Sequence, residues 1–144
     1  MARIGGSWYA VRAMTRVKRS DDCGNSPKNA FVEDFTIALA TRDGDGVAAR
    51  VSDDVRLNVV GRAPILGKDA VMNALDAMAP VATLTIARVM THGRTGAVNG
   101  VVEYANGGGA EFCNVYEFSS ARGNRVSDIT AYVVAITATH HDGR

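Results

Sequence analysis

Residues 91–134 read THGRTGAVNGVVEYANGGG, AEFCNVYEFSSARGN and RVSDITAYVV in succession, and they give the strongest indication of the fold. Each of the three segments is rich in β-branched and aromatic residues, and turns that contain glycine separate them. Long strands joined by short turns pair as an antiparallel sheet. We expect this sheet to curve over helices from the first half of the chain and to enclose a pocket, where a small molecule would bind.

The first helix is predicted to begin at a serine-proline pair, residues 26 and 27. A serine oxygen caps a helix N-terminus, and proline suits the first helical turn. Apolar residues, Phe35 among them, then recur at helical spacing and form one buried stripe. The acids Glu33 and Asp34 are expected on the solvated face, near the positive end of the helix dipole.

Two shorter helices and two further strands complete the predicted order. Asp45 is expected to cap a second helix, and residues 67–79 form a third helix that Pro80 stops. Strands are predicted at residues 55–60 and 81–90. The order ααβαββββ favours an α+β fold, in which three helices pack on one face of a strongly curved, mainly antiparallel sheet.

Composition and charge exclude several classes of partner. The 144 residues suit one domain at residues 26–137, between a basic arm at 1–25 and a polar tail at 138–144. With 16 basic and 15 acidic side chains, no net field attracts nucleic acid or an anionic membrane. No apolar run approaches the roughly 18 residues of a membrane span. Cys23 and Cys113 are too few for a disulfide framework or a metal knuckle. We therefore expect a cytoplasmic protein with no metal, cofactor, nucleic-acid or membrane partner.

The basic arm at residues 1–25 has three interpretations. Its five cations precede the first acid, which is typical of an organelle transit peptide. Alternatively, the start codon is assigned too early and Met14 is the first residue. In the third interpretation the arm packs on the body of the domain through apolar residues such as Trp8 and Tyr9.

Four short blocks carry a resemblance to a known family. They are Gly44-Asp45, SDDV at residues 52–55, GKDAV at residues 67–71, and the end block at residues 116–132. With these blocks in this order, the chain resembles the nuclear transport factor 2-like superfamily, in its SnoaL-like and ketosteroid-isomerase-like branch. The resemblance covers about residues 27–136 and implies a cone whose bent sheet wraps the helices around a ligand cavity.

The resemblance implies a range of functions and an assembly. Members include isomerases, epoxide hydrolases, polyketide cyclases, dehydratases and binders without catalysis, so the fold does not imply one function. The outer face of the sheet commonly pairs with a second copy in this superfamily, which implies a homodimer through that face. Ala97 and Val115 are among the apolar residues expected on that face, and they agree with a covered surface.

The ionisable residues of two enzymatic relatives are missing from this sequence. Alignment with ketosteroid isomerases puts the general base at Val59 and an oxyanion partner at Ile37, and neither is able to move a proton. A third position falls on Asn114, which is able to donate a hydrogen bond to a carbonyl or an oxyanion. The positions of limonene-epoxide-hydrolase-like enzymes carry no charge either: they fall on Leu57, Val59, Val102, Tyr104 and Ala131. Both known mechanisms are therefore disfavoured.

Strand alternation decides which polar groups face the predicted cavity. Because neighbouring side chains of a strand point to opposite faces, Asn114 and Tyr116 face inward if Glu117 faces solvent. By the same reasoning Val102 and Tyr104 face inward. A shift of one residue reverses every assignment, and Asn99 and Glu103 would then enter the cavity.

The predicted site follows from this alternation. The candidates for chemistry are Asn114, Tyr104 and His92; a histidine at a strand end is either a base near neutral pH or only a hydrogen-bonding residue. The residues predicted to line the cavity are Phe35, Leu57, Val59, Met78, Met90, Val102, Phe112, Tyr116, Ile129 and Ala131. The favoured function is binding or transformation of a small apolar, oxygen-bearing molecule, and a non-catalytic binder or a dimeric adaptor module is the alternative.

Overall fold

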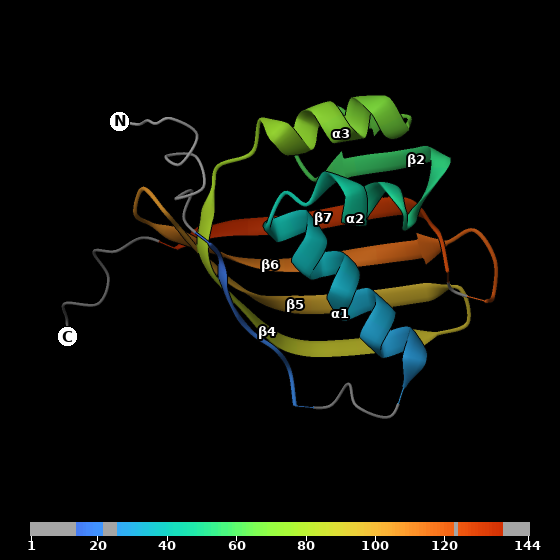
Figure 1. The fold of residues 1–144 in the computed structure, drawn as a ribbon, viewed down its shortest axis with the longest axis horizontal. Coiled ribbons are helices and arrows are strands. Elements are labelled where there is room, and N and C mark those ends of the chain that lie inside the picture. Colours follow the sequence, from blue (N-terminus) through green and yellow to red (C-terminus); the bar gives the residue numbers. More distant parts are fainter. Residues whose placement is uncertain (1–13, 22–25, 123, 137–144) are drawn as a thin grey trace.

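The computed structural model describes residues 14–21, 26–122 and 124–136, and its described helices lie on one face of a curved seven-stranded sheet (Figure 1). The helices are α1 (Pro27–Ala40), α2 (Gly44–Ala48) and α3 (Lys68–Asp76). The strands are β1 (Arg16–Lys18), β2 (Val51–Val59), β3 (Ile65–Leu66), β4 (Val81–His92), β5 (Thr95–Tyr104), β6 (Gly109–Phe118) and β7 (Val126–Ile136).

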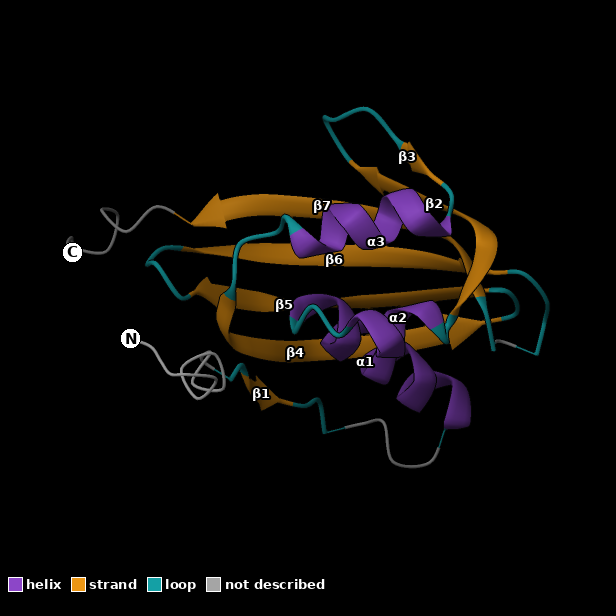
Figure 2. Ribbon diagram, turned by 45° about the horizontal axis from the view of Figure 1, so that its top comes forward, coloured by secondary structure: helices purple, strands orange, loops and turns teal. Residues whose placement is uncertain are grey.

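Four long antiparallel strands, β4 to β7, form the middle of the sheet, and short strands extend both edges. The strand order is β1-β4-β5-β6-β7-β2-β3, with β1 parallel to β4 and β2 parallel to β7. All three helices lie on the same side of this sheet, which we call the inner face (Figure 2). The predicted α+β fold is confirmed, although β1 and β3 were not predicted.

Local signals in the sequence place the helix starts. The Ser26 side chain accepts a hydrogen bond from the Asn29 amide at 3.2 Å, with proline in the first turn, as the sequence predicts. The second helix is capped by Asp43, whose carboxylate accepts from the Gly46 amide at 3.0 Å, so the prediction of Asp45 as its cap is wrong. Asp45 lies in the first turn instead, where its charge suits the helix dipole.

The long helix α1 packs closely on the sheet because β5 offers glycine beneath it. A Cβ atom at Gly96 would lie 2.8 Å from the Val32 side chain of α1. At Gly100 a Cβ would clash with the Thr85 carbonyl oxygen and lie 3.1 Å from the Phe112 ring. No larger residue fits at Gly100 without moving backbone, so glycine there permits the close approach of the neighbouring strand and of the Phe112 ring.

The strands adopt the first of the two alternations that the sequence allows. Phe112, Tyr116 and Phe118 of β6 are buried on the inner face, while Glu117 is exposed on the opposite, outer face. Asn99 of β5 pairs with Cys113 on that outer face, and Glu103 is exposed. The core lies on the inner face, where β2 and β4 to β7 pack against residues of α1, α2 and α3.

Part of the stretch that the sequence assigns to the arm packs on the domain. Residues 16–18 form β1 along the edge of β4, and the Thr15 hydroxyl donates to the Val81 carbonyl oxygen at 2.7 Å. Arg19 then reaches α1 and donates to Glu33 at 3.0 Å and to Asp34 at 2.6 Å. This contact raises the pKa of the Arg19 guanidinium, chiefly through its hydrogen bond with Asp34.

The prediction that Glu33 lies on a solvated helix face is wrong. Its side chain is 1% exposed, and its second carboxylate oxygen accepts from the Ser20 amide at 2.8 Å. The segment around β1 lies beside this part of α1 and removes the carboxylate from water. Because a buried charge is costly without partners, Arg19 and the Ser20 amide together make the burial of Glu33 possible.

We expect Arg19→Met to lower the free energy of unfolding by about 1–3 kcal/mol, since it leaves the buried Glu33 carboxylate short of a donor. Asp34→Asn is the matched control, and it should cost only about 0–1 kcal/mol because the Asp34 side chain is 41% exposed and its charge is screened by water. Urea unfolding of both variants measures the difference. Equal losses would mean that the burial of Glu33 does not depend on Arg19.

Candidate functional site

A chain of hydrogen bonds crosses the inner face from β6 to α1. The Thr36 hydroxyl donates to the Val32 carbonyl oxygen at 2.8 Å, so its oxygen accepts from the Tyr116 hydroxyl at 2.6 Å. The Tyr116 oxygen in turn accepts from the Asn114 side-chain amide, Nδ2, at 3.2 Å. The chain therefore runs in one direction, from Asn114 through Tyr116 and Thr36 to the backbone of α1.

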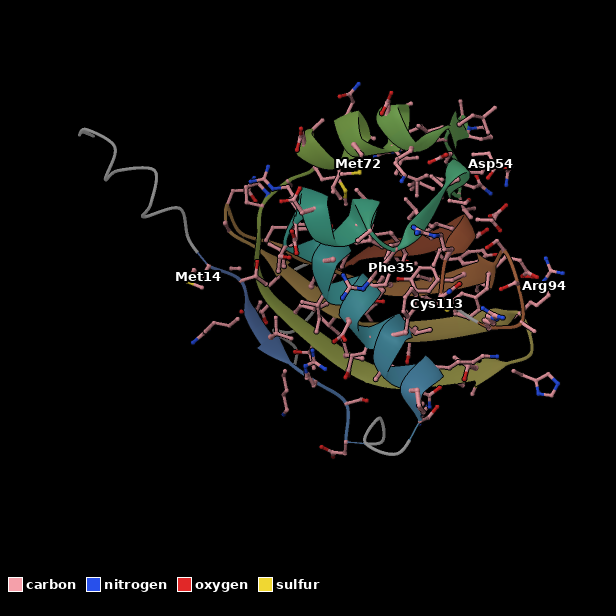
Figure 3. The ribbon with its side chains drawn as sticks, turned by 45° about the vertical axis from the view of Figure 1, so that its right-hand side comes forward. Met14, Phe35, Asp54, Met72, Arg94 and Cys113 are labelled. Atoms are coloured by element: carbon pink, nitrogen blue, oxygen red, sulfur yellow. The ribbon has the colours of Figure 1, made fainter. Side chains whose placement is uncertain are left out.

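Aromatic packing holds the phenol of Tyr116 in place. The Phe35 ring meets the Tyr116 ring edge to face, with centroids 5.0 Å apart and an interplanar angle of 77°. Phe31 continues the cluster, since it stacks with Phe35 and meets Phe118 edge to face. Figure 3 shows Phe35 between α1 and the sheet. The phenol is thus fixed on both sides, by its ring contacts and by its hydroxyl.

Burial raises the pKa of Tyr116 to about 12, against an ordinary value of 10.0. The cause is the loss of water around a side chain that is fully buried. The hydrogen bonds with Thr36 and Asn114 act in the opposite direction and are weaker than the burial. At neutral pH the phenol keeps its proton, so Tyr116 is a donor and not a base.

Asn114 is the part of this chain that is able to meet a ligand. Its side chain is half-buried on the inner face, and its one hydrogen bond within the described part of the chain is the bond to Tyr116. No buried side-chain nitrogen or oxygen among those residues lacks a partner, so the Asn114 oxygen remains open to solvent. The amide thus has one N–H and one carbonyl oxygen left to offer.

Apolar side chains surround this amide. Val98 and Ala131 lie directly opposite Asn114 on the neighbouring strands, and Val59 lies beside Ala131. The remaining predicted lining residues on the inner face belong to the core or pack against it: Phe35, Leu57, Val102, Phe112, Tyr116 and Ile129. Tyr104, at the end of β5, also packs against the core. The structure thus brings Asn114, Tyr104 and eight of the ten predicted lining residues to one face.

Met90, His92 and Met78 do not join this group. The placement of Met90 inside is wrong, because its side chain is 63% exposed on the outer face. In the pairing of β4 with β5, a β-bulge between Ile86 and Arg88 inserts one residue, Ala87, into β4. The insertion inverts the alternation of the side chains that follow it. His92 is exposed at the end of β4 on that same outer face, so its candidacy as a base within the inner face is contradicted by its position.

Met78 follows α3 and is exposed as well. Its backbone carbonyl accepts a hydrogen bond from Arg42, which ties the end of α3 to the end of α1. The side chain is therefore not part of the wall around Asn114.

The outer face of the sheet is hollowed. A shallow hollow of about 440 Å³ lies there, between β4 and β7. Its lining includes Arg88, Met90, Glu111, Cys113 and Tyr132. The lining of this hollow mixes charged side chains, such as Arg88 and Glu111, with apolar ones. The strand positions opposite Asn114, in contrast, carry the apolar residues Val98 and Ala131.

Within the described ranges, no three His, Cys, Asp or Glu side chains gather as metal ligands. Among the same residues, no helix has both the length and the apolar character that crossing a membrane requires. Residues 1–13 and 137–144, which include most of the predicted arm and tail, lie outside the described residues.

Comparison with known families gives the fold its name. Residues 32–129 match the model of the SnoaL-like domain. The chain belongs to the SnoaL-like family. The resemblance inferred from the sequence is thus confirmed, and the nuclear transport factor 2-like fold with it. No curated protein sequence matches the chain.

Several solved structures share this fold at low sequence identity. A protein of Kribbella flavida, provisionally named a ketosteroid isomerase, is 18% identical with a TM-score of 0.66, over 76% of this chain and 79% of its own. An epoxide hydrolase of Mycobacterium tuberculosis, similar to limonene epoxide hydrolase, is 21% identical with a TM-score of 0.61, over 74% and 81%. A provisionally named polyketide cyclase of Sinorhizobium meliloti is 16% identical with a TM-score of 0.59, over 71% and 93%.

Sequence reasoning missed Thr36 as a part of the site of this SnoaL-like chain, and it misplaced the buried Glu33. Thr36 accepts the phenol hydrogen, and its only signal in the sequence is a polar residue on the apolar stripe of the first helix. Glu33 lies on the same stripe one turn earlier, and its partner Arg19 is far away in sequence. Polar residues at buried helical positions were the available signal for both.

Tyr116→Phe should change how stability depends on pH. Because the folded-state pKa exceeds the unfolded one, the proton on Tyr116 stabilises the fold fully below pH 10, and this contribution is lost as pH rises to about 12. The difference between the folded and unfolded pKa of Tyr116 corresponds to about 3 kcal/mol of folding free energy. We expect urea unfolding between pH 9 and 12 to show a shallower alkaline decline for Tyr116→Phe, which also costs about 1 kcal/mol at neutral pH.

The control for this measurement is Tyr132→Phe, whose side chain is exposed on the outer face. That variant retains Tyr116 and should keep the decline of the unaltered protein. An unchanged decline in Tyr116→Phe would contradict a buried phenol.

Proposed function

We propose that this SnoaL-like protein binds a small, neutral, apolar molecule that carries an oxygen atom, on the inner face beside Asn114. The observation that supports it is the half-buried Asn114 amide, which has a free N–H and a free oxygen within the described part of the chain. Val98 and Ala131 flank it. A site of apolar walls with one fixed polar group is typical of small-molecule recognition.

The direction of the hydrogen-bond chain favours a ligand hydroxyl or carbonyl. Since Asn114 already donates to Tyr116, which donates to Thr36, the chain polarises the amide and strengthens its oxygen as an acceptor. A hydroxyl of the ligand would donate to that oxygen, and a carbonyl would accept from the second N–H. Tyr104, on the same face, is the candidate for a second polar contact.

Transformation of such a molecule is the second candidate function. Related structures bear the names of an isomerase, an epoxide hydrolase and a polyketide cyclase, and Asn114 is able to polarise a carbonyl as an oxyanion donor does. A proton transfer also needs a base. Among the described residues, the strand positions opposite Asn114 carry no carboxylate or imidazole, and Glu33 is already paired with Arg19. These observations favour binding over acid–base catalysis.

Asn114→Ala should weaken ligand binding by about 5- to 10-fold, the equivalent of one hydrogen bond of about 1 kcal/mol. A panel of steroid ketones, terpene epoxides and aromatic polyketides, tested by thermal shift and calorimetry, identifies a binder. Native mass spectrometry of the purified protein detects a bound compound directly.

Cys113→Ala is the matched control for that variant, because Cys113 precedes Asn114 on the same strand and lies on the outer face. Equal affinity of both variants would remove Asn114 from the site. Turnover of a panel compound that depends on Asn114 would favour the enzymatic alternative.

We also propose that two copies pair through the outer face of the sheet, as the family resemblance implies. Met90, Tyr132 and Val134 are exposed apolar residues on this face. Such a row of large apolar side chains is costly in water and is typical of a covered surface. The hollow of the outer face lies among the same residues.

Met90→Glu should convert a dimer to a monomer, because it puts a charge into the covered surface. Sedimentation equilibrium measures the mass. Met78→Glu is the control, since it makes the same change at an exposed methionine that follows α3 on the helical side. A monomeric unaltered protein at all concentrations would contradict the proposal.

A further inference from the structure

The hollow of the outer face contains two charges of opposite sign. Arg88 of β4 and Glu111 of β6 are the charged residues of its lining, and both side chains are exposed. Because β5 lies between their strands, the two groups are about 10 Å apart across the sheet, which is too far for an ion pair with each other. Within the part of the chain that the structure describes, neither forms an ion pair with another residue.

Other charges of the outer face are in a different situation. Asp128, near the start of β7, pairs with Arg56 at 3.4 Å. His92 and Glu103 are exposed near the ends of their strands, outside the lining of the hollow. A surface that covers the hollow therefore has to compensate two charges there, because a charge removed from water without a partner is costly. It needs an acid at one point and a base at another.

A second copy of the chain supplies both groups. In a symmetric pair every contact occurs twice, since residue i of one copy meets residue j of the other and the reverse. Consider a two-fold axis that lies between two facing sheets, midway between Arg88 and Glu111. It puts Arg88 of each copy over Glu111 of the other. One surface thus contains both members of the ion pair and complements itself.

The apolar residues of the hollow follow the same geometry. Ala97 lies on the strand next to Arg88, two residues from the residue that pairs with Arg88. Tyr132 has the same relation to Glu111, and the step runs in the same direction along the sheet. With strands about 4.8 Å apart and residues of one face about 6.8 Å apart along a strand, this step is parallel to the axis. The axis therefore also puts Tyr132 over Ala97 of the other copy.

That second contact matches a large side chain with a small one. Tyr132 is 49% exposed, and its ring projects from the same surface in which Ala97 leaves space. A large residue over a small one allows two surfaces to fill each other, as in a protein interior. The charges and the apolar residues of the hollow thus select a single arrangement of the two copies.

We propose that two copies meet at the hollow of the outer face through two reciprocal ion pairs between Arg88 and Glu111, with Tyr132 of each copy over Ala97 of the other. This inference rests on the outer-face dimer proposed above, and it adds the residues that select the partner and the register. Apolar side chains alone would allow several registers, whereas charges exclude the arrangements that bring like signs together.

Exchange of the charges tests the proposal in the full chain. Arg88→Glu puts two acids together at each of the two contacts, and Glu111→Arg puts two bases together. We expect each variant alone to dimerise about 100-fold more weakly than the unaltered protein, because like charges at an interface are costly and the symmetry doubles the cost. An equimolar mixture of the two variants should dimerise again, since every contact then joins an acid and a base.

Sedimentation equilibrium of the unaltered protein, the two variants and their mixture gives the masses. A monomeric unaltered protein would overturn the outer-face dimer itself. A dimeric unaltered protein whose two variants also remain dimers, or whose variants do not recover in the mixture, would overturn only the ion pairs. Asp76→Arg is the matched control, because it makes the same charge change as Glu111→Arg on α3, on the opposite side of the sheet, and it should leave the dimer unchanged.

The double variant R88E/E111R is a second measurement that needs no mixing. Each copy then carries the exchanged pair, so the variant should form a homodimer of about the original affinity. A folded double variant that stays monomeric, as judged by circular dichroism together with its mass, would overturn the proposal.

Discussion

The position of α1 on the sheet is set by the burial of Val32 and Phe35 together with one buried hydrogen bond, the 2.6 Å contact between Thr36 and Tyr116. Tyr116 is fully buried, and a buried hydroxyl without a partner costs about 1–3 kcal/mol. Thr36 accepts the hydrogen bond of this hydroxyl only when the face of α1 that carries Thr36 is turned toward β6 at close range. The neighbouring residue, Phe35, then meets the ring of the same tyrosine. The polar contact and the packing of Phe35 together specify the rotation of the helix and its place along the strand.

The same contact explains two other features of the fold. A helix this close to the sheet needs space beneath it, and Gly96 of β5 provides that space under Val32. The phenol that bonds to Thr36 also holds Asn114, two residues earlier on β6 and on the same face. The amide is thus oriented by a group whose own position is determined by packing. Such preorganisation lowers the entropy cost of ligand binding, because the contacting side chain is already ordered.

Much of the fold was predictable because its signals are local. The serine-proline pair before α1 and the alternation of β6 were both visible in sequence, and the inward placement of Asn114 and Tyr116 followed from the exposure of Glu117. The family resemblance was also visible, since it depends on short blocks in a fixed order.

The failures have non-local or irregular causes. A one-residue insertion at Ala87 inverts the alternation of β4, so Met90 and His92 point outward, and no turn residue in the sequence marks the insertion. The burial of Glu33 depends on Arg19, a residue of another element, and no helical pattern contains that information. β1 is a three-residue edge strand held by pairing with β4, and such a strand is too short to leave a pattern of its own.

The charge balance of the inner face limits the chemistry that it supports. Its polar chain ends in a neutral amide at one side and a backbone carbonyl at the other, and Tyr116 between them stays protonated to about pH 12. A charged ligand beside Asn114 would lose its hydration and gain no opposite charge from the residues on the neighbouring strands. A neutral ligand loses little and gains the apolar contacts of Val98 and Ala131. Among the described residues, the strand positions opposite Asn114 carry no ionisable side chain, and this is the physical basis of the proposed preference for neutral, weakly polar molecules.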